Sequence, residues 1–136
     1  MKKLVVDALT DNLDEVIGFV SGMVEEYDCP FRLVTAIELT VEEIFVNIAH
    51  YAYAPGTGKA EITADVGGDP LTLTVTFEDS GVPYDPLAKE DPDVTLPAAE
   101  RQIGGLGIFL VKKNMDDVLY EYRNGKNVLT IIKKLA

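Results

Sequence analysis

A carboxylate and an amide stand one helical turn apart in the segment VEEIFVNIAHYAY, residues 41–53. Glu43 and Asn47 are separated by four residues, so on a helix both project from the same side. A carboxylate can act as a general base, and an amide oxygen can ligate Mg²⁺, which takes few protein oxygens alongside phosphates and water. The alternative is an ordinary solvated helix face, which is the usual explanation of E-x-x-x-N on its own.

A second candidate group is the segment EDSGVPYDP, residues 78–86. Asp79 precedes Gly81 by two residues at the expected end of a strand. The carboxylate could accept a hydrogen bond from an exocyclic amine such as that of adenine, and the glycine would allow a close backbone approach. The alternative is a plain turn, since Asp, Ser, Gly and Pro all favour turns.

The third group is IGGLGIFLVKK, in which Gly104, Gly105 and Gly107 open an amphipathic helix. Free amides and the positive end of the helix dipole form a natural anion site there. The segment lacks the lysine-serine ending of a P-loop, and it follows an irregular stretch rather than the strand that a dinucleotide motif requires. Glycines are common where helices begin, so this pattern alone is not specific.

These groups require a particular set of elements to position them. Apolar periodicity predicts strands over residues 3–8, 60–66 and 71–77, helices over 10–27, 30–50 and 104–115, and a final hairpin around Asn124-Gly125. This order predicts an α+β fold, a two-layer α/β sandwich with a mixed, mostly antiparallel sheet and helices on one face. A stretch rich in proline and aspartate, residues 82–104, is predicted to be a lid within one domain spanning 1–136.

Composition restricts the function. Twelve basic and 23 acidic residues give a net charge of −11, which argues against direct nucleic-acid binding. No run approaches the roughly 18–20 apolar residues of a membrane span, and the N-terminus is a poor signal peptide. The single Cys29 excludes an internal disulfide and a cysteine-based metal cluster, and we expect it to be a packed residue at a helix junction. We therefore expect a cytoplasmic protein.

The order of the three groups is more informative than any of them alone. A helix with E-x-x-x-N, a hairpin ending in D-x-G-x-P, a proline-rich lid and a glycine-opened helix resemble the Bergerat ATP-binding fold of histidine kinases, gyrase and Hsp90. More narrowly, EEIFVNIAHYAY, EDSGVPYDP and GGLGIFLVKKNMDD resemble the anti-sigma-factor serine/threonine kinases of bacteria. The motifs span residues 37–118, and the flanking elements extend the resemblance over nearly the whole chain.

The resemblance implies a role for each matching residue. Asn47 would ligate the Mg²⁺ that bridges the ATP phosphates, and Glu43 would be the general base for the attacking hydroxyl or water. Asp79 would bind the adenine amine, and Gly81 would let the base approach. The helix-opening turn would lie under the phosphates; its residues are Gly104, Gly105, Leu106 and Gly107.

Some positions match less well. The family often carries a histidine four residues after the asparagine, where this chain has Tyr51, with His50 one place earlier. We therefore expect His50 to be structural. Arg101 lies just before the glycines, where it could reach a phosphate or belong to a solvated lid.

The resemblance implies a kinase that uses ATP and Mg²⁺ to phosphorylate a small antagonist protein of the anti-anti-sigma type, and so regulates transcription by partner switching. The alternative is a non-catalytic, nucleotide-responsive module that sequesters a sigma factor or another regulator. A complete histidine kinase is disfavoured because 136 residues leave no room for a phosphoacceptor helix. Related kinases commonly dimerise, so a homodimer remains open.

Overall fold

The computed structural model of the protein describes residues 1–88 and 106–135. Its strands are β1 (Lys2–Asp7), β2 (Lys59–Gly67), β3 (Thr72–Asp79), β4 (Asp117–Arg123) and β5 (Lys126–Lys134). Its α-helices are α1 (Leu13–Glu25), α2 (Phe31–Asn47) and α3 (Leu106–Asn114), and α2 continues into a π-helical turn, Ile48–Ala52. Short 3₁₀ turns lie at Thr10–Asn12 and Pro86–Ala88. None of the described helices is long and apolar enough to cross a membrane.

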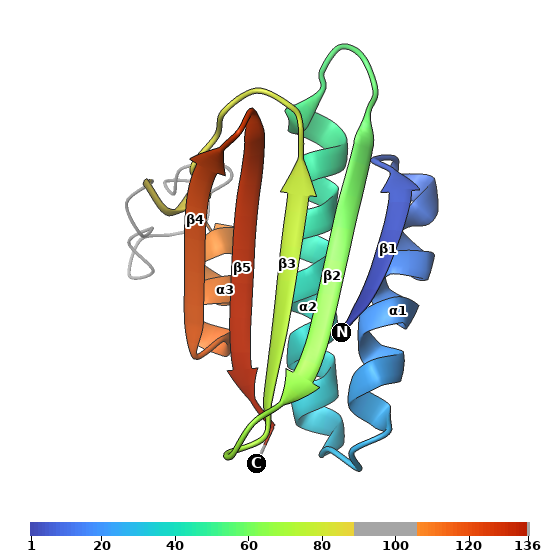
Figure 1. The fold of residues 1–136 in the computed structure, drawn as a ribbon, viewed down its shortest axis with the longest axis vertical. Helices are drawn as coiled ribbons and strands as arrows, with labels where there is room; N and C mark the ends of the chain where they lie inside the picture. Colours follow the sequence, from blue (N-terminus) through green and yellow to red (C-terminus); the bar gives the residue numbers. More distant parts are fainter. Residues whose placement is uncertain (89–105, 136) are drawn as a thin grey trace.

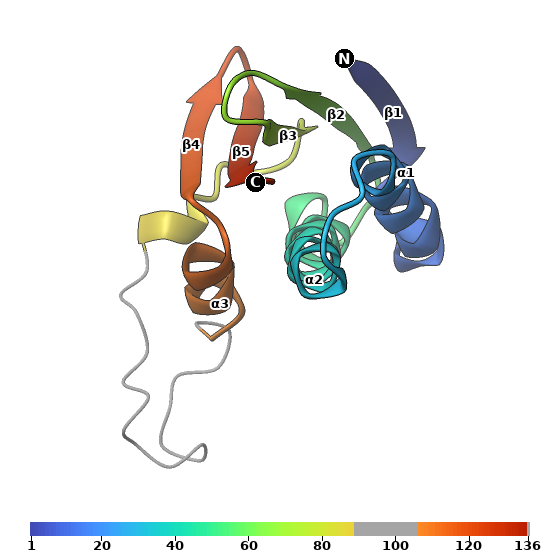
Figure 2. The ribbon, with the colours of Figure 1, turned by 90° about the horizontal axis from the view of Figure 1, so that it is seen from below.

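The five strands form one sheet in the order β1-β2-β3-β5-β4, with the three helices on one face (Figures 1 and 2). The predicted two-layer α+β sandwich is thus confirmed. The prediction of a mixed sheet is wrong in one respect, because every pairing among these strands is antiparallel. The physical reason is the antiparallel pair of helices between β1 and β2. This pair returns the chain to the end where β1 finishes, so that β2 begins with Lys59 beside Asp7 and runs opposite to β1.

Strict alternation on β3 makes the two faces of the sheet different. Every second residue is buried, and Leu73, Val75 and Phe77 point toward the helices while threonines face outward. The helices contribute the other half of the core through Val16, Val20, Ile37, Val41 and Phe45, all with no exposed surface. The apolar stripe predicted for the second helix is therefore its core-facing side.

The terminal hairpin has the predicted turn. Asn124 and Gly125 both have positive φ, 55° and 78°, and Arg123 pairs with Lys126, which defines a two-residue turn of the type that Asn-Gly favours. This turn fixes the register of β5 against β4, and on its other side β5 pairs with β3. In the pairing of β5 with β3, Asn127 pairs with Asp79.

Cys29 is half-buried in the α1–α2 connection and packs against the core, as expected. Burial, and to a smaller degree the neighbouring Asp28, raises the pKa of its thiol. The neutral thiol is favoured, which suits a packed residue rather than a nucleophile.

Candidate functional site

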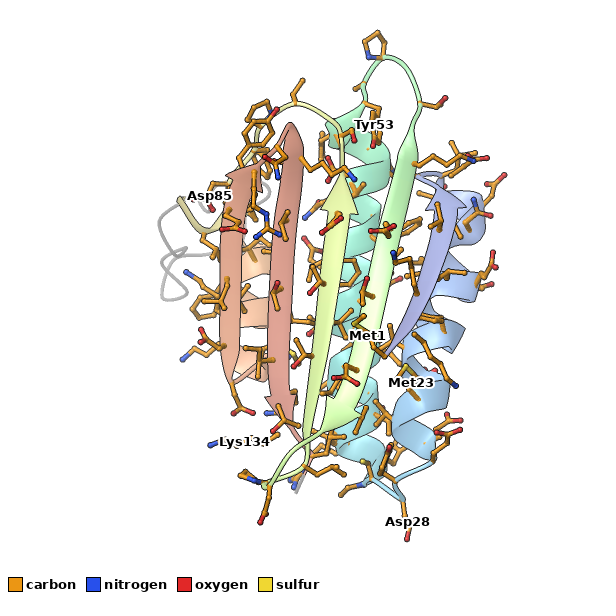
Figure 3. All side chains as sticks on the ribbon, in the orientation of Figure 1. Met1, Met23, Asp28, Tyr53, Asp85 and Lys134 are labelled. Carbon is orange, nitrogen blue, oxygen red and sulfur yellow. The ribbon has the colours of Figure 1, made fainter. Side chains whose placement is uncertain are left out.

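The candidate site lies at the end of the sheet where β3 ends and β5 begins. Figure 3 shows Tyr53 and Asp85 at this end, and Asp28 and Lys134 at the opposite one. Here α2 has passed into its π-helical turn, and the chain leaving β3 continues into the segment 80–86. The inner face of the sheet is therefore flanked here by a turn and a loop.

Asp79 is the last residue of β3 and is only 6% exposed. One of its carboxylate oxygens, Oδ1, accepts hydrogen bonds from the amide of Gly81 and from the side chain of Asn127, each 2.9 Å long. Asp79 is thus a buried acceptor whose orientation is fixed from two sides.

Gly81 lies against the π-helical turn. A Cβ atom at this position would come within 2.1 Å of the carbonyl oxygen of Ala52, and the next amide, that of Val82, donates to the same oxygen at 2.9 Å. The sequence predicted a glycine that leaves room for a base. In the structure, the close approach that requires glycine is between the chain after β3 and the turn after α2.

A pocket opens between these elements. Its lining combines an apolar wall with a few polar side chains, which is the usual composition of a small-molecule site. The lining residues are Ile44, Asn47, Ile48, Tyr51, Ala52, Phe77, Asp79, Val82, Pro83, Tyr84, Pro86, Ile108, Tyr120, Asn127 and Leu129. A flat apolar group with an amine at its edge would fit the chemistry of this lining, because the wall can bury the ring and Asp79 can accept the amine.

Glu43 and Asn47 lie together on α2, as their spacing predicts. The side-chain amide of Asn47 donates to Oε1 of Glu43 at 3.1 Å, and both residues are half-buried. A carboxylate only accepts, so the amide nitrogen must face it, and the Asn47 oxygen remains unengaged among the described residues. One hard oxygen beside the pocket fits Mg²⁺ held mainly by phosphates.

The two residues face different hollows. Asn47 lines the pocket that contains Asp79, whereas Glu43 lines an adjoining groove between α2 and α3. The lining of the groove also includes Leu39, Thr40, Glu42, Val46, Gly107, Leu110, Val111 and Asn114. The hydrogen bond between Glu43 and Asn47 therefore links a side chain of the pocket with a side chain of the groove.

Gly107 is the second residue of α3 and packs directly on Glu43. A Cβ atom there would come within 2.0 Å of the Glu43 carboxylate, so a larger residue would displace this side chain. Of the predicted helix-opening turn, only the main chain of Leu106 and Gly107 is described. Gly104, Gly105, Arg101 and residues 89–104 of the predicted lid lie outside the described residues.

Two further polar side chains of this region make local contacts. Thr40, three residues before Glu43 on α2, is buried at the groove and donates to the carbonyl of Ala36. His50 is exposed and meets Tyr51 edge to face, with ring centroids 5.9 Å apart. Tyr51 lines the pocket and His50 does not.

Sequence reasoning missed Asn127 and Tyr120. Asn127 is buried opposite Asp79, and the hydroxyl of Tyr120 donates to its side-chain oxygen. Burial is the main cause that raises the pKa of Tyr120, so the hydroxyl keeps its proton and remains a donor. Neither residue belongs to a local motif; only the register of β3, β5 and β4 brings them to Asp79.

Comparison with known proteins agrees with this geometry. Residues 6–133 match the family described as "Histidine kinase-like ATPase domain". The chain belongs to this ATPase domain family. The resemblance to anti-sigma-factor kinase-like domains that the three motifs indicated is thereby confirmed.

Several kinases resemble this ATPase domain. Serine-protein kinase RsbW of Listeria monocytogenes is 28% identical over 114 residues, which cover 81% of this chain and 72% of that protein. Serine/threonine-protein kinase BtrW of Bordetella bronchiseptica is 29% identical over 105 residues, which cover 77% of this chain and 73% of that protein. Serine-protein kinase RsbW of Bacillus cereus is 25% identical over 114 residues, which cover 81% of this chain and 70% of that protein.

Proposed function

We propose that this ATPase domain is an ATP- and Mg²⁺-dependent protein serine/threonine kinase that phosphorylates a small antagonist protein. Partner switching between that antagonist and a sigma factor would then regulate transcription in the cytoplasm. Two relatives named as serine or serine/threonine kinases support the reaction class. The single observation that carries the proposal is the hydrogen-bonded pair Glu43 and Asn47, with one member on each of two adjoining hollows.

In this proposal the pocket holds the nucleotide. Asp79 accepts the adenine amine, the apolar wall covers the ring, and the Asn47 oxygen faces the phosphates. Mg²⁺ held there would neutralise charge on the phosphates during transfer. The main chain of the turn before α3, with Gly104, Gly105, Leu106 and Gly107, would donate to the phosphates, and the lid 82–104 would cover them.

Glu43 would act from the groove side. The acceptor hydroxyl would approach between α2 and α3, where Leu39 and Leu110 are 55% and 48% exposed. Its oxygen would form the new bond to the γ-phosphorus while the bond to the bridging oxygen breaks and ADP leaves. The Glu43 carboxylate would take the hydroxyl proton, and Asn47 would hold that carboxylate in place.

The transfer step is tested with Glu43→Gln, which removes the basic oxygen but keeps an acceptor for Asn47. We expect γ-labelled ATP to label serine or threonine of the antagonist with the wild-type domain, and a loss of roughly 100-fold or more in the variant. ATP affinity should stay within about threefold of wild type, since Glu43 does not line the nucleotide pocket.

Glu38→Gln is the matched control, because Glu38 lies on the same helix, lines neither the pocket nor the groove, and loses the same charge. It should leave labelling unchanged. Equal labelling by wild type and Glu43→Gln would contradict the assigned role of Glu43. ATP binding without labelling by any of the three proteins would reject the kinase and favour the non-catalytic sequestering module.

A further inference from the structure

Asn127 is a buried polar side chain whose hydrogen-bonding capacity is completely used. It is 7% exposed and lies on β5 directly opposite Asp79. Its amide nitrogen donates to Oδ1 of Asp79 at 2.9 Å and to the carbonyl of Val82 at 2.8 Å. Its oxygen accepts from the amide of Tyr84 at 3.1 Å and from the hydroxyl of Tyr120. An asparagine side chain offers two donors and two acceptor positions, so all four are engaged.

The orientation of this amide is determined by its backbone partners. The Val82 carbonyl can only accept and the Tyr84 amide can only donate, so the nitrogen and oxygen of Asn127 cannot be exchanged. Asn127 must therefore present an N–H group to Asp79. The same side chain ties the segment 82–84 to the sheet.

This contact leaves Asp79 with one available oxygen. Oδ1 already accepts from Gly81 and Asn127, whereas no hydrogen bond to Oδ2 is found within the described part of the chain. No buried side-chain polar atom there lacks a partner. Oδ2 must therefore keep contact with the space outside the protein, and Asp79 lines the pocket.

We propose that Asn127 is a positioning residue for base recognition. By occupying Oδ1 of Asp79 it directs Oδ2 to the pocket and makes the site select a purine with an amine at its edge. This inference rests on the proposed ATP binding. A 6-oxo purine would place an acceptor against the acceptor Oδ2, and the buried carboxylate would lose its partner. Asn127 thus acts on specificity through Asp79 without touching the phosphates.

Asn127→Asp tests this role with almost no change in size. It replaces the N–H group that faces Asp79 with an oxygen, so two carboxylates meet and one proton must be shared between them. The other titratable groups around this position are Tyr120 and Tyr122 on β4 and Tyr84 and Asp85 after β3. Burial raises the pKa of Tyr120, so its hydroxyl keeps its proton, and we expect the new carboxylate pair to dominate titration between about pH 5 and 8.

The measurement is ATP affinity with excess Mg²⁺, expressed as the ratio of variant to wild type at each pH. At pH 8 the Asn127→Asp protein should bind ATP roughly 10- to 100-fold more weakly than wild type, the effect of losing a hydrogen bond to a charged group. The ratio of variant to wild-type affinity should recover toward one as the pH falls to about 5, because a proton shared between Asp79 and the new carboxylate restores a donor. A ratio that does not change with pH would overturn the inference.

A second variant covers the case in which Asn127→Asp does not fold. Asn127→Val suits a strand but cannot donate, so Asp79 loses its orientation at every pH. ATP binding should weaken roughly 10-fold or more while binding of inosine triphosphate, which has a 6-oxo group, changes little. A purely structural role would weaken both nucleotides equally, and that result would overturn the inference.

Asn124→Asp is the matched control. It makes the same amide-to-carboxylate change in the same hairpin, at an exposed position whose positive φ aspartate tolerates. It should bind both nucleotides as wild type does at every pH. If the wild-type protein bound no ATP at all, the proposed function would be wrong. If wild type bound ATP and only the results expected for the Asn127 variants failed, the role of Asn127 alone would be wrong.

Discussion

At the residue scale, Glu43 and Asn47 are hydrogen-bonded to each other, yet each of them lines a different hollow. Asn47 borders the pocket that Asp79 enters, and Glu43 borders the groove between α2 and α3. In the proposed function this arrangement would separate nucleotide binding from proton transfer, since Asn47 would meet the phosphates and Glu43 an incoming hydroxyl. The division leads to different expectations for the two side chains.

Asn47→Ala should remove the magnesium dependence of ATP binding. The wild-type domain should bind ATP more tightly when Mg²⁺ is added, because the free Asn47 oxygen supplies a hard ligand. We expect the variant to bind ATP·Mg²⁺ about tenfold or more weakly and to gain little from Mg²⁺, as measured by calorimetry with Mg²⁺ or with a chelator. Asn114→Ala, at the end of α3 and outside the pocket, serves as control. An unchanged Mg²⁺ response in Asn47→Ala would contradict the assignment.

The sequence predicted those parts of the candidate site that are local in the chain. Glu43 and Asn47 share a helix, and Asp79 and Gly81 share a strand end, so their spacing alone brings them together. Asn127 contacts Asp79 across 48 residues of sequence, and that contact depends on the pairing of β5 with β3. A single buried asparagine in an apolar strand carries no local signal of such a partner.

At the element scale, the sequence predicted each helix and strand but not the end of the second helix. Apolar periodicity continued to His50, whereas α2 ends at Asn47 and a π-helical turn follows to Ala52. Tyr51, at the position where the family often carries a histidine, lies in this turn and lines the pocket. Periodicity of 3.6 cannot reveal a change of helix type, because the difference lies in hydrogen bonding along the backbone.

Two glycines in different elements should respond in opposite ways to alanine. Gly18 is exposed in α1, and a Cβ atom added there would have no neighbour within 4 Å, so Gly18→Ala should raise the free energy of unfolding by about 0.5–1 kcal/mol. In Gly81→Ala the new Cβ atom would meet the Ala52 carbonyl, so this change should lower the free energy of unfolding by about 1–3 kcal/mol. Urea unfolding followed by circular dichroism measures both. A destabilising Gly18→Ala would show that this face of α1 is covered.

At the scale of the whole molecule, the chain combines a net charge of −11 with a proposed anionic ligand. Within the described residues, neither lysine nor arginine lines the pocket. The phosphates would therefore depend on main-chain amides and on Mg²⁺ rather than on a basic cluster. The antiparallel sheet serves this arrangement by placing Asp79, Asn127 and the π-helical turn at one end.

The proposed function depends on ATP binding in the pocket that has Asp79 at its polar edge. The most direct measurement is a calorimetric titration of the folded domain with ATP in the presence of Mg²⁺, for wild type and for Asp79→Asn. We predict saturable binding by wild type and affinity lower by roughly 10- to 100-fold in the variant, because a charged acceptor is lost. No ATP binding by wild type, or equal binding by Asp79→Asn with its fold intact, would contradict the account.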